Sequence, residues 1–390
     1  MIEQGKAEPD EKANFGVLLI SGKRTHQENY APWFKADSRC RIVAVADEAG
    51  VNSQRAALNR EFAEEFEVPY LSDLDEALSR DDVNIVSVCA EPERRARVLA
   101  RCARAGKHLY IDKPMTPYRD SAAEVVAAVE ESGVCSQMYS FVNASWMRRA
   151  KATIAAGELG DIRAIHMDCM FAKGPAGTAD LRIERRQDRS PERFTFVDSK
   201  AEFYAIGVYA LGVISWLSEM RVSSIYGHTS NFFFAEHQRN GQEDFGAFLL
   251  NLERGVTASV TGGRVGWSSH PGSGVNQLVV LGSKKNLRLD GNAPRVEIYS
   301  RNHSWQPPEE NPDDPMGFWQ STQDAVGLEP KNTWVPLDAE SEDINDVSRF
   351  IDRVVQGRNG DIDARAAAHL TDVIVSGYES AATRKIVYIT

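Results

Sequence analysis

The segment 105–114 holds the residues of this chain that are best suited to chemistry. An apolar run, residues 108–111, is followed at once by an acid, a cation and a proline, Asp112-Lys113-Pro114. Pro114 has no backbone donor and biases Lys113 away from helix, so a strand should end here. A lysine at the carboxyl end of a buried strand faces the crevice where open α/β sheets bind ligands. Lys113 is therefore the first catalytic candidate, and a solvated surface lysine is the alternative.

The neighbouring segments alternate between strand and helix in a way that would place Lys113 at such an edge. Segments 52–66 and 93–105 carry apolar residues at helical spacing. The runs between them are too continuous for half-exposed strands and suit parallel strands buried on both faces; they cover residues 14–20, 41–47, 84–90 and 108–111. The alternation predicts a doubly wound parallel sheet.

The second half of the chain has a different pattern. A helix is expected at 144–156 and closing helices at 342–355 and 364–381. Closely spaced runs without intervening helices predict an antiparallel sheet; they cover 161–172, 222–234, 246–252, 256–261, 277–282, 287–290, 295–299 and 385–389. A chain of 390 residues is too long for one core. We expect a polar tail at 1–13, a dinucleotide-binding domain at 14–141 and an α+β domain at 142–390.

These motifs together resemble the family of glucose-fructose oxidoreductase, inositol dehydrogenase and MocA, from about Phe15 to the C-terminus. The segment 105–114 is similar to the family's Ala-Gly-Lys-His to Glu-Lys-Pro segment, with Asp112 in place of the glutamate. Residues 45–47, 157–162 and 207–217 also match. The resemblance implies an NAD(P)-binding Rossmann-type domain, a C-terminal domain with a large, mainly antiparallel sheet, and Lys113 as the catalytic lysine.

Asp47 ends the second strand, where a dinucleotide-binding fold places the acid that accepts from an adenosine ribose hydroxyl. A carboxylate there disfavours a 2′-phosphate, and Glu48 follows with no arginine immediately after. The sequence thus favours NAD over NADP. The alternative for Asp47 is a helix cap.

The first turn departs from the family. Such folds carry three spaced glycines after the first strand, whereas this turn retains only Gly22, flanked by Ser21, Lys23 and Arg24. Helix amides can still hold phosphate, with Lys23 or Arg24 adding charge. The competing interpretation is that the turn has lost its dinucleotide.

The segment after the third strand departs as well. The family usually has Thr-Pro-Asn and then a histidine near the nicotinamide ribose, and this chain has Ala90, Glu91 and later Arg95. Glu91 is a candidate ribose acceptor. With Asp112 and Lys113, these residues complete the expected cofactor contacts.

The catalytic helix lacks the family's aspartate and histidine, since Ala205 and Tyr209 stand at those positions. Oxidation of a carbinol requires a group that removes the hydroxyl proton. Tyr209 can do this if Lys113 lowers its pKa, and Glu202, seven residues earlier, would lie on the same helical face. We expect Lys113 and Tyr209 to form the acid/base pair, with Glu202 orienting one of them or a substrate hydroxyl; Glu202 is also the other candidate for handling the proton. An ordinary core aromatic is the alternative for Tyr209.

Composition excludes several functions. The net charge of −11 argues against a nucleic-acid surface. The longest apolar stretch, 205–217, is too short to cross a bilayer, and the N-terminal segment lacks the features of a signal peptide. The five cysteines show no metal or redox spacing, and His166 and Cys169 should point to opposite faces of a strand. We expect a cytoplasmic protein with reduced thiols and no metal.

Two irregular stretches are candidates for the substrate pocket. Residues 182–193 include Arg182, Arg185, Arg186, Arg189 and Arg193, which could hold a carboxylated or phosphorylated substrate or form a solvated loop. Residues 304–320 carry Trp305, Phe318 and Trp319, whose rings could stack on sugars or close a subunit interface.

The sequence therefore predicts an NAD-dependent oxidoreductase acting on a sugar, sugar acid or cyclitol, as a homodimer or homotetramer like its family. Two alternatives remain open. One is an enzyme that recycles bound NAD during elimination or glycoside cleavage. The other is a catalytically inactive sugar- or nucleotide-binding regulator.

Overall fold

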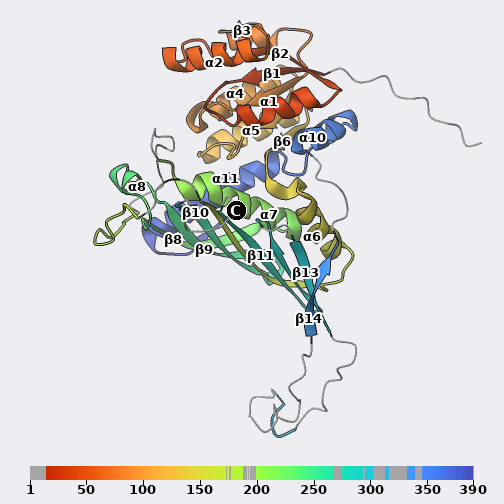
Figure 1. Ribbon diagram of the computed structural model, residues 1–390, viewed down its shortest axis with the longest axis vertical. Coiled ribbons are helices and arrows are strands. Elements are labelled where there is room, and N and C mark those ends of the chain that lie inside the picture. Colours follow the sequence, from red (N-terminus) through yellow and green to blue (C-terminus); the bar gives the residue numbers. More distant parts are fainter. Residues whose placement is uncertain are drawn as a thin grey trace, which may run out of the picture.

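Figure 1 presents the computed structural model, in which two sheet-containing parts lie one above the other. The upper part holds a six-stranded sheet and the lower part a nine-stranded sheet. The structure describes residues 15–172, 174, 177–187, 191, 193, 199–266, 274–292, 295–301, 312–315, 332–338 and 345–389. The predicted α/β class, with one parallel and one mainly antiparallel sheet, is confirmed.

The upper sheet is wholly parallel and has the order β3-β2-β1-β4-β5-β6. The central strands are apolar runs buried on both faces, as the sequence predicted. Its strands are β1 (Phe15–Ile20), β2 (Cys40–Ala46), β3 (Tyr70–Leu71), β4 (Ile85–Val88), β5 (His108–Ile111) and β6 (Ser136–Met138).

Five helices connect these strands. Asn52 caps α2 by accepting from the amide of Arg55, and Pro92 stands at the start of α4, where its missing N–H costs nothing. Because all strands run the same way, the segments after β1, β4 and β5 meet at one edge of the sheet. The helices are α1 (Gln27–Ala36), α2 (Ser53–Glu65), α3 (Leu74–Leu78), α4 (Pro92–Arg104) and α5 (Arg119–Ser132).

The lower sheet has the order β14-β13-β12-β11-β7-β10-β9-β8-β15 and is antiparallel except between β7 and β10. Along β7, buried and exposed residues alternate, as expected for a sheet with one covered face. Its strands are β7 (Ile162–Ala172), β8 (Val222–Ser230), β9 (Phe245–Leu252), β10 (Thr257–Val265), β11 (Gly274–Gly282), β12 (Asn286–Asp290), β13 (Arg295–Arg301), β14 (Asn332–Leu337) and β15 (Val387–Tyr388).

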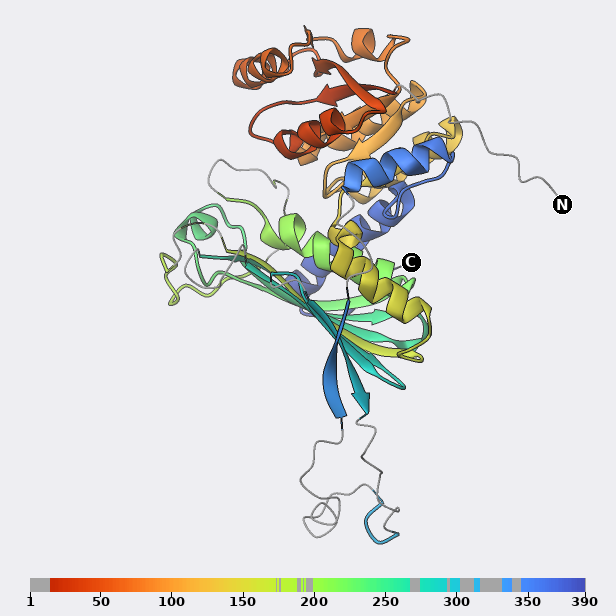
Figure 2. The ribbon, with the colours of Figure 1, turned by 45° about the vertical axis from the view of Figure 1, so that its right-hand side comes forward.

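Helices cover the upper face of this sheet and separate it from the first sheet (Figures 1 and 2). A π-helical turn, Phe203–Gly207, leads directly into α7. The other elements of this part are η1 (Phe141–Asn143), α6 (Ser145–Ala155), α7 (Val208–Ser218), α8 (Ala235–Arg239), η3 (Glu253–Gly255) and α11 (Ala364–Thr383).

One late helix returns to the upper part. Helix α10 (Asp346–Val355) lies against α1 and β5 in Figures 1 and 2, although its residues fall within the predicted second domain. Its Phe350 ring lies 5.6 Å from the ring of Tyr110 on β5, and Tyr110 donates to Asp346 at 2.6 Å. The core of the upper part is therefore built from both ends of the chain.

Candidate functional site

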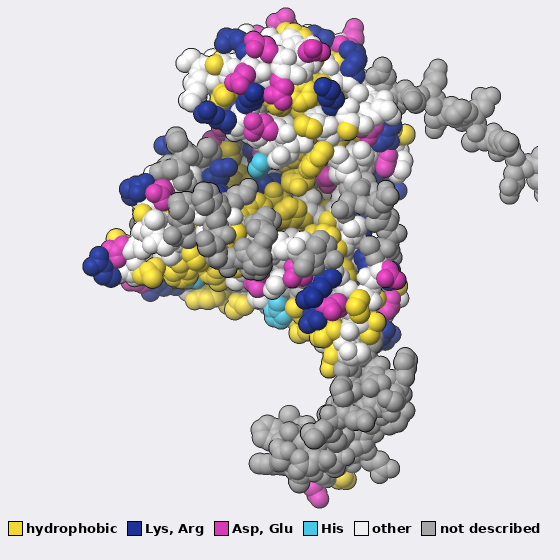
Figure 3. All heavy atoms as spheres, in the orientation of Figure 1, with side chains coloured by type: hydrophobic (Ala, Val, Ile, Leu, Met, Phe, Trp, Pro, Cys, Tyr) yellow, Lys and Arg dark blue, Asp and Glu magenta, His cyan; other side chains and the backbone are white. Residues whose placement is uncertain are grey.

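The carboxyl edge of the upper sheet borders a cavity of about 360 Å³. It is lined from the upper part by the turn after β1 and the segments after β4 and β5, and from the lower part by the start of the π-helical turn. Figure 3 shows hydrophobic side chains between the two parts. The residues that matter most for chemistry are Arg24, His26, Arg95, Asp112, Lys113 and Ala205.

Lys113 lies in this cavity directly after β5, with only 5% of its surface exposed. Its Nζ donates to the carbonyl oxygen of Ala205 at 2.6 Å and lies 4.5 Å from the ring centroid of Tyr209. Burial lowers the pKa of Lys113 to about 7, although the charge of Asp112 opposes this. The ammonium can thus lose a proton near neutral pH, and the resulting amine can take one up.

Asp112 organises the groups around this lysine. Arg95 of α4 donates to its carboxylate at 2.8 Å, and Tyr30 donates at 3.0 Å. Burial acts to raise the pKa of Asp112, but Arg95 and His26 outweigh it and hold the pKa well below its usual range. Arg95, expected to touch cofactor, is buried and also donates to the carbonyl groups of Ala90, Asp112 and Pro114.

His26 is a site residue that the sequence reasoning missed. Its Nδ1 lies 2.7 Å from Oδ1 of Asp112, and its partly exposed ring lines the same cavity as Lys113. A carboxylate on one ring nitrogen orients an imidazole and leaves the other nitrogen for a ligand. The sequence feature that could have identified His26 is its position at the end of the turn that follows the first strand.

Tyr209 differs from the expectation. Its ring is stacked on Phe141, with centroids 4.0 Å apart and planes 8° from parallel. Burial raises the pKa of its hydroxyl well above 10, so the prediction that Lys113 lowers this pKa is wrong. Lys113 faces the ring and donates to a backbone carbonyl instead. The desolvation of a closely packed aromatic outweighs the attraction of one nearby cation.

Glu202 lies next to this region but has other partners. It is fully buried and accepts from Arg264 Nε at 2.7 Å, with His237 Nε2 at 3.1 Å. Burial acts to raise its pKa, yet these two groups bring the pKa below its usual value. The same-face argument assumed α-helical spacing, whereas the π-helical turn lies between Glu202 and Tyr209. Within the described residues Glu202 makes no hydrogen bond to Lys113 or Tyr209.

The turn after β1 packs against α2. Ser21 has a left-handed backbone with φ of 65°, and the amide of Gly22 donates to Asn59 Oδ1 at 2.8 Å. A Cβ on Gly22 would lie 2.7 Å from Cβ of Phe62, so only glycine fits there. Lys23 turns toward Glu61, whose carboxylate it contacts at 2.6 Å, and of the two predicted cations Arg24 is the one that lines the cavity.

Asp47 is fully buried among donors. It accepts from Ser21 Oγ at 3.0 Å, Asn59 Nδ2 at 2.9 Å and Arg94 Nη1 at 2.6 Å. Arg94 was not predicted, because the sequence drew attention to its neighbour Arg95. A ribose hydroxyl would reach the Asp47 carboxylate only if the Arg94 side chain moved.

A second cavity of about 530 Å³ continues past the first. Arg55 and Glu91 line both cavities and lie 3.3 Å apart, Nε to Oε1. Burial raises the pKa of Glu91, but Arg94 and Arg55 lower it further, so the carboxylate is ionised. An elongated ligand with a central diphosphate fits this arrangement, because Arg24 and Arg55 lie where the cavities meet the turn after β1.

Within the described residues, the arginine-rich stretch 182–193 lines neither of these two cavities. Arg185 is held by Thr229, Gly241 and the buried Glu243, and Arg182 pairs with Asp180 in solvent. Arg186 and Arg193 are exposed. Arg189 and the aromatic residues Trp305, Phe318 and Trp319 lie outside the described residues.

The described part of the chain holds no cluster of three or more histidine, cysteine or acidic side chains suited to a metal ion. No helix within those ranges combines the length and the apolar character needed to span a bilayer. Along β7, His166 is exposed and Cys169 is buried, so they lie on opposite faces.

The sequence matches the models of a known oxidoreductase family in both halves of the chain. Residues 16–140 match a model of an oxidoreductase family with an NAD-binding Rossmann fold, and residues 147–288 match a GFO/IDH/MocA C-terminal domain. A dTDP-3,4-didehydro-2,6-dideoxy-α-D-glucose 3-reductase of Streptomyces violaceoruber is 29% identical over 194 residues, 49% of this chain and 51% of the relative. The chain thus spans about half the length of that relative.

Solved structures show the same fold along most of the chain. An oxidoreductase domain protein of Kribbella flavida superposes with a TM-score of 0.72 and 15% identity, covering 97% of this chain and 100% of the other. GenD2 from gentamicin A biosynthesis, solved in complex with NAD, has a TM-score of 0.67 and 18% identity over 100% of this chain and 99% of its own.

Proposed function

This chain belongs to the Gfo/Idh/MocA family of NAD-binding oxidoreductases, and from that premise we propose that it transfers a hydride between NAD and a sugar-like substrate. The substrate carbon would be a carbinol or carbonyl carbon of a sugar, sugar acid or cyclitol. The name of the Streptomyces relative, a reductase of a sugar nucleotide, supports this substrate class.

The observation that carries the proposal is the state of Lys113. Its ammonium is buried at the carboxyl end of β5, inside the cavity, with a pKa lowered to about 7. A general acid or base works best when its pKa is near the operating pH. In our proposal Lys113 breaks its hydrogen bond to the carbonyl of Ala205 and donates a hydrogen bond to the reacting oxygen of the substrate. It then takes the proton of that oxygen during oxidation or returns it during reduction.

His26 would act beside Lys113 in this scheme. Asp112 fixes the imidazole at Nδ1, so the ring presents its other nitrogen within the cavity. That nitrogen would hold a substrate or ribose hydroxyl. Tyr209 would position Lys113 with its ring, and Glu202 would hold the π-helical turn through Arg264 and His237.

NAD, when bound, supplies the nicotinamide carbon that accepts or donates the hydride. We propose that Ser21, Gly22 and Arg24 hold its diphosphate, and that Asp47, Glu48 and Glu91 bound the adenosine side. The cavity on that side has four arginines against five carboxylates, so it offers no excess positive charge to a 2′-phosphate. This favours NAD over NADP.

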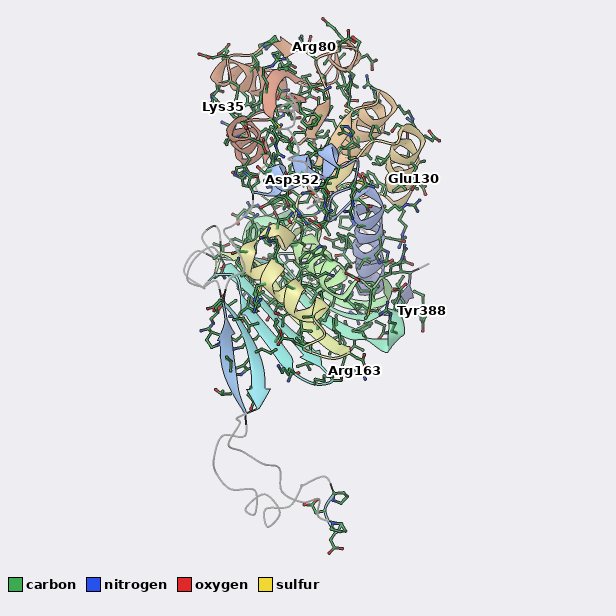
Figure 4. The ribbon with its side chains drawn as sticks, turned by 90° about the vertical axis from the view of Figure 1, so that its right-hand side faces the viewer. Lys35, Arg80, Glu130, Arg163, Asp352 and Tyr388 are labelled. Atoms are coloured by element: carbon green, nitrogen blue, oxygen red, sulfur yellow. The ribbon has the colours of Figure 1, made fainter. Side chains whose placement is uncertain are left out.

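Replacement of the lysine tests the proposal. We expect Lys113→Met to lower the turnover of NADH with a panel of keto sugars by ~10²-fold or more, while NADH binding, followed by its fluorescence, stays within about threefold. Lys35→Met, on the outer surface of α1 (Figure 4), is the matched control and should match the wild type.

Three results would contradict it. Unchanged turnover in Lys113→Met would remove the lysine from the chemistry. Absence of NADH and NAD binding to the wild-type chain would favour the inactive regulator. Product formation without net change in NADH would favour the enzyme that recycles its cofactor.

A further inference from the structure

A cavity of about 640 Å³ lies apart from the Lys113 cleft, at the junction between α10 and the lower part. Figure 4 shows α10, marked by Asp352, above α6 and beside α11. The end of α7 and the segment 358–362 complete the walls. Six cationic side chains line the cavity against two carboxylates, in a protein with a net charge of −11; the cations are Lys151, Arg221, Arg349, Arg353, Arg358 and Arg365.

The carboxylates satisfy only part of this charge. Asp361 accepts from Arg349 and Arg353, each at 3.3 Å. Glu219 pairs with Lys151 at 2.6 Å. In the described ranges, no ion pair neutralises the guanidinium groups of Arg221 and Arg358. The walls therefore present an excess of positive charge to any occupant.

Three residues of the cavity wall carry buried donor atoms. The backbone amide of Val222 donates to Nε2 of His369 at 3.0 Å, which places the imidazole proton on Nδ1. His369 is only 8% exposed, and its Nδ1 has no partner among the described residues. The same holds in those ranges for Ser215 Oγ and Arg353 Nε, which line the same cavity. Buried donors normally have acceptors, whereas the walls of this cavity hold three donors that are unsatisfied within the described residues.

The ends of two helices lie at the cavity. Helix α11 starts at Ala364, and its first turns line the cavity with Arg365, Ala366 and His369, while the carboxylate of Asp363 caps its N-terminus by accepting from the amide of Ala366. The negative carboxyl end of α7 is covered, because Lys151 Nζ donates to the carbonyl of Trp216 at 2.7 Å.

We propose that this cavity binds the phosphate group of a small phosphorylated metabolite. A phosphate has several acceptor oxygens and close to two negative charges, which suit guanidinium, imidazole and hydroxyl donors together. The volume admits the organic part of such a molecule as well. Ser215 lies near one end of α7, and Ala205, which accepts from Lys113, lies just before its other end. An occupant would thus connect α10 with the helix that borders the catalytic cleft.

Calorimetric titration with inorganic phosphate and with glucose 6-phosphate, at constant ionic strength, tests this site. We expect saturable binding to the wild-type chain. The double variant Arg221→Gln/Arg358→Gln, altered at two exposed arginines, should weaken it by at least about tenfold, and Ser215→Ala by about threefold. Tighter binding of the ester than of the free ion would identify a metabolite; equal binding would identify inorganic phosphate as the ligand.

The control is Arg163→Gln, at an exposed position of β7 that lines neither this cavity nor the Lys113 cleft, and it should bind both probes as the wild type does. Absence of saturable binding, full binding by the double variant, or loss in Arg163→Gln would each overturn the proposal. NADH binding, measured without phosphate, should be unchanged in the double variant. That measurement separates a failure of this site from a failure of the catalytic proposal.

Discussion

At the scale of single residues, the proposed chemistry depends on Lys113, whose pKa is set by its surroundings. Its position could be predicted, because a strand that ends in Asp112-Lys113-Pro114 has a clear sequence pattern. His26 and Arg94 could not, since their roles depend on which side chains of other segments reach them. The wrong expectation for Tyr209 has the same origin: its distance from Phe141 and its burial are properties of the packed structure.

The proton balance of Lys113 gives the first prediction at this scale. With a pKa of about 7, the neutral amine is the base for oxidation, so kcat/KM for oxidation should rise with pH and level off above about 7. The reduction needs the ammonium and should fall over the same range. Lys113→Arg, which stays charged, should lose the rising limb. Identical pH profiles for both proteins would exclude Lys113 as the titrating group.

Tyr209 gives the second prediction at the scale of single residues. Because its hydroxyl has a raised pKa and its ring faces the ammonium, Tyr209→Phe should retain kcat within about threefold, whereas Tyr209→Leu should lower it by about tenfold or more. Steady-state kinetics with NADH and a substrate carbonyl would measure both. A large loss in the phenylalanine variant would restore the phenol to the chemistry.

At the scale of elements, the structure depends on contacts between segments that lie far apart in the sequence. Most strands were predictable from periodicity, as were the longer helices α2, α4, α6, α7 and α11, whereas the strands β3, β6 and β14 were not predicted. The π-helical turn was not, because a wider turn leaves no period in a uniformly apolar segment. The return of α10 to the upper part was not predictable either, since its amphipathic pattern identifies an apolar face but not the sheet that covers it.

Asp346 connects the start of α10 to β5, β6 and η1 through hydrogen bonds, and it gives the third prediction. It accepts from Tyr110, Gln137 and Asn143 at 2.6 to 2.7 Å. Asp346→Ala leaves the buried donors of Tyr110 and Asn143 without this acceptor and leaves Gln137 only the backbone carbonyl of residue 346, so it should lower the free energy of unfolding by ~3 kcal/mol. Asp346→Asn should cost less than about 1.5 kcal/mol, because Asn143 Oδ1, unpartnered within the described residues, can accept from the new amide.

The pH dependence of the free energy of unfolding also distinguishes the wild type from Asp346→Asn. Burial raises the pKa of Asp346 to about 6, above its value in the unfolded chain. The folded state therefore holds the proton more tightly, and this contribution to stability is lost as the pH rises from about 4 through 6. Urea titrations at both pH values should show this loss in the wild type and not in Asp346→Asn. Equal losses would assign the titration to another group.

At the scale of the whole molecule, the face of the lower sheet away from the helices carries exposed apolar residues. Tyr226 is 45%, Leu249 60% and Ile386 54% exposed, and they line one groove of about 570 Å³. Figure 3 shows hydrophobic side chains along the underside of this sheet. Such a patch indicates an interface. We expect a second copy of the chain to cover it.

Leu249→Arg tests this expectation. Light scattering should give a dimer or tetramer for the wild type and a smaller species for the variant, because a buried arginine without a partner is costly. NADH binding should persist, since Leu249 lies far from the Lys113 cavity in sequence and lines none of it. Val355→Arg, at an exposed apolar position of α10, is the control. A monomeric wild type would contradict the expectation.

The route of α10 also limits how such molecules can be recombined. The upper part takes Val347, Phe350, Ile351 and Val354 into its apolar interior from near the end of the chain. In a chimaera joined once, between residues 141 and 142, α10 would come from the second parent. It would then pack against the nucleotide-binding half of the first parent, with which it did not evolve. Exchanging substrate preference between two such enzymes without loss of solubility would take three crossover points, so that the nucleotide-binding half keeps its own α10.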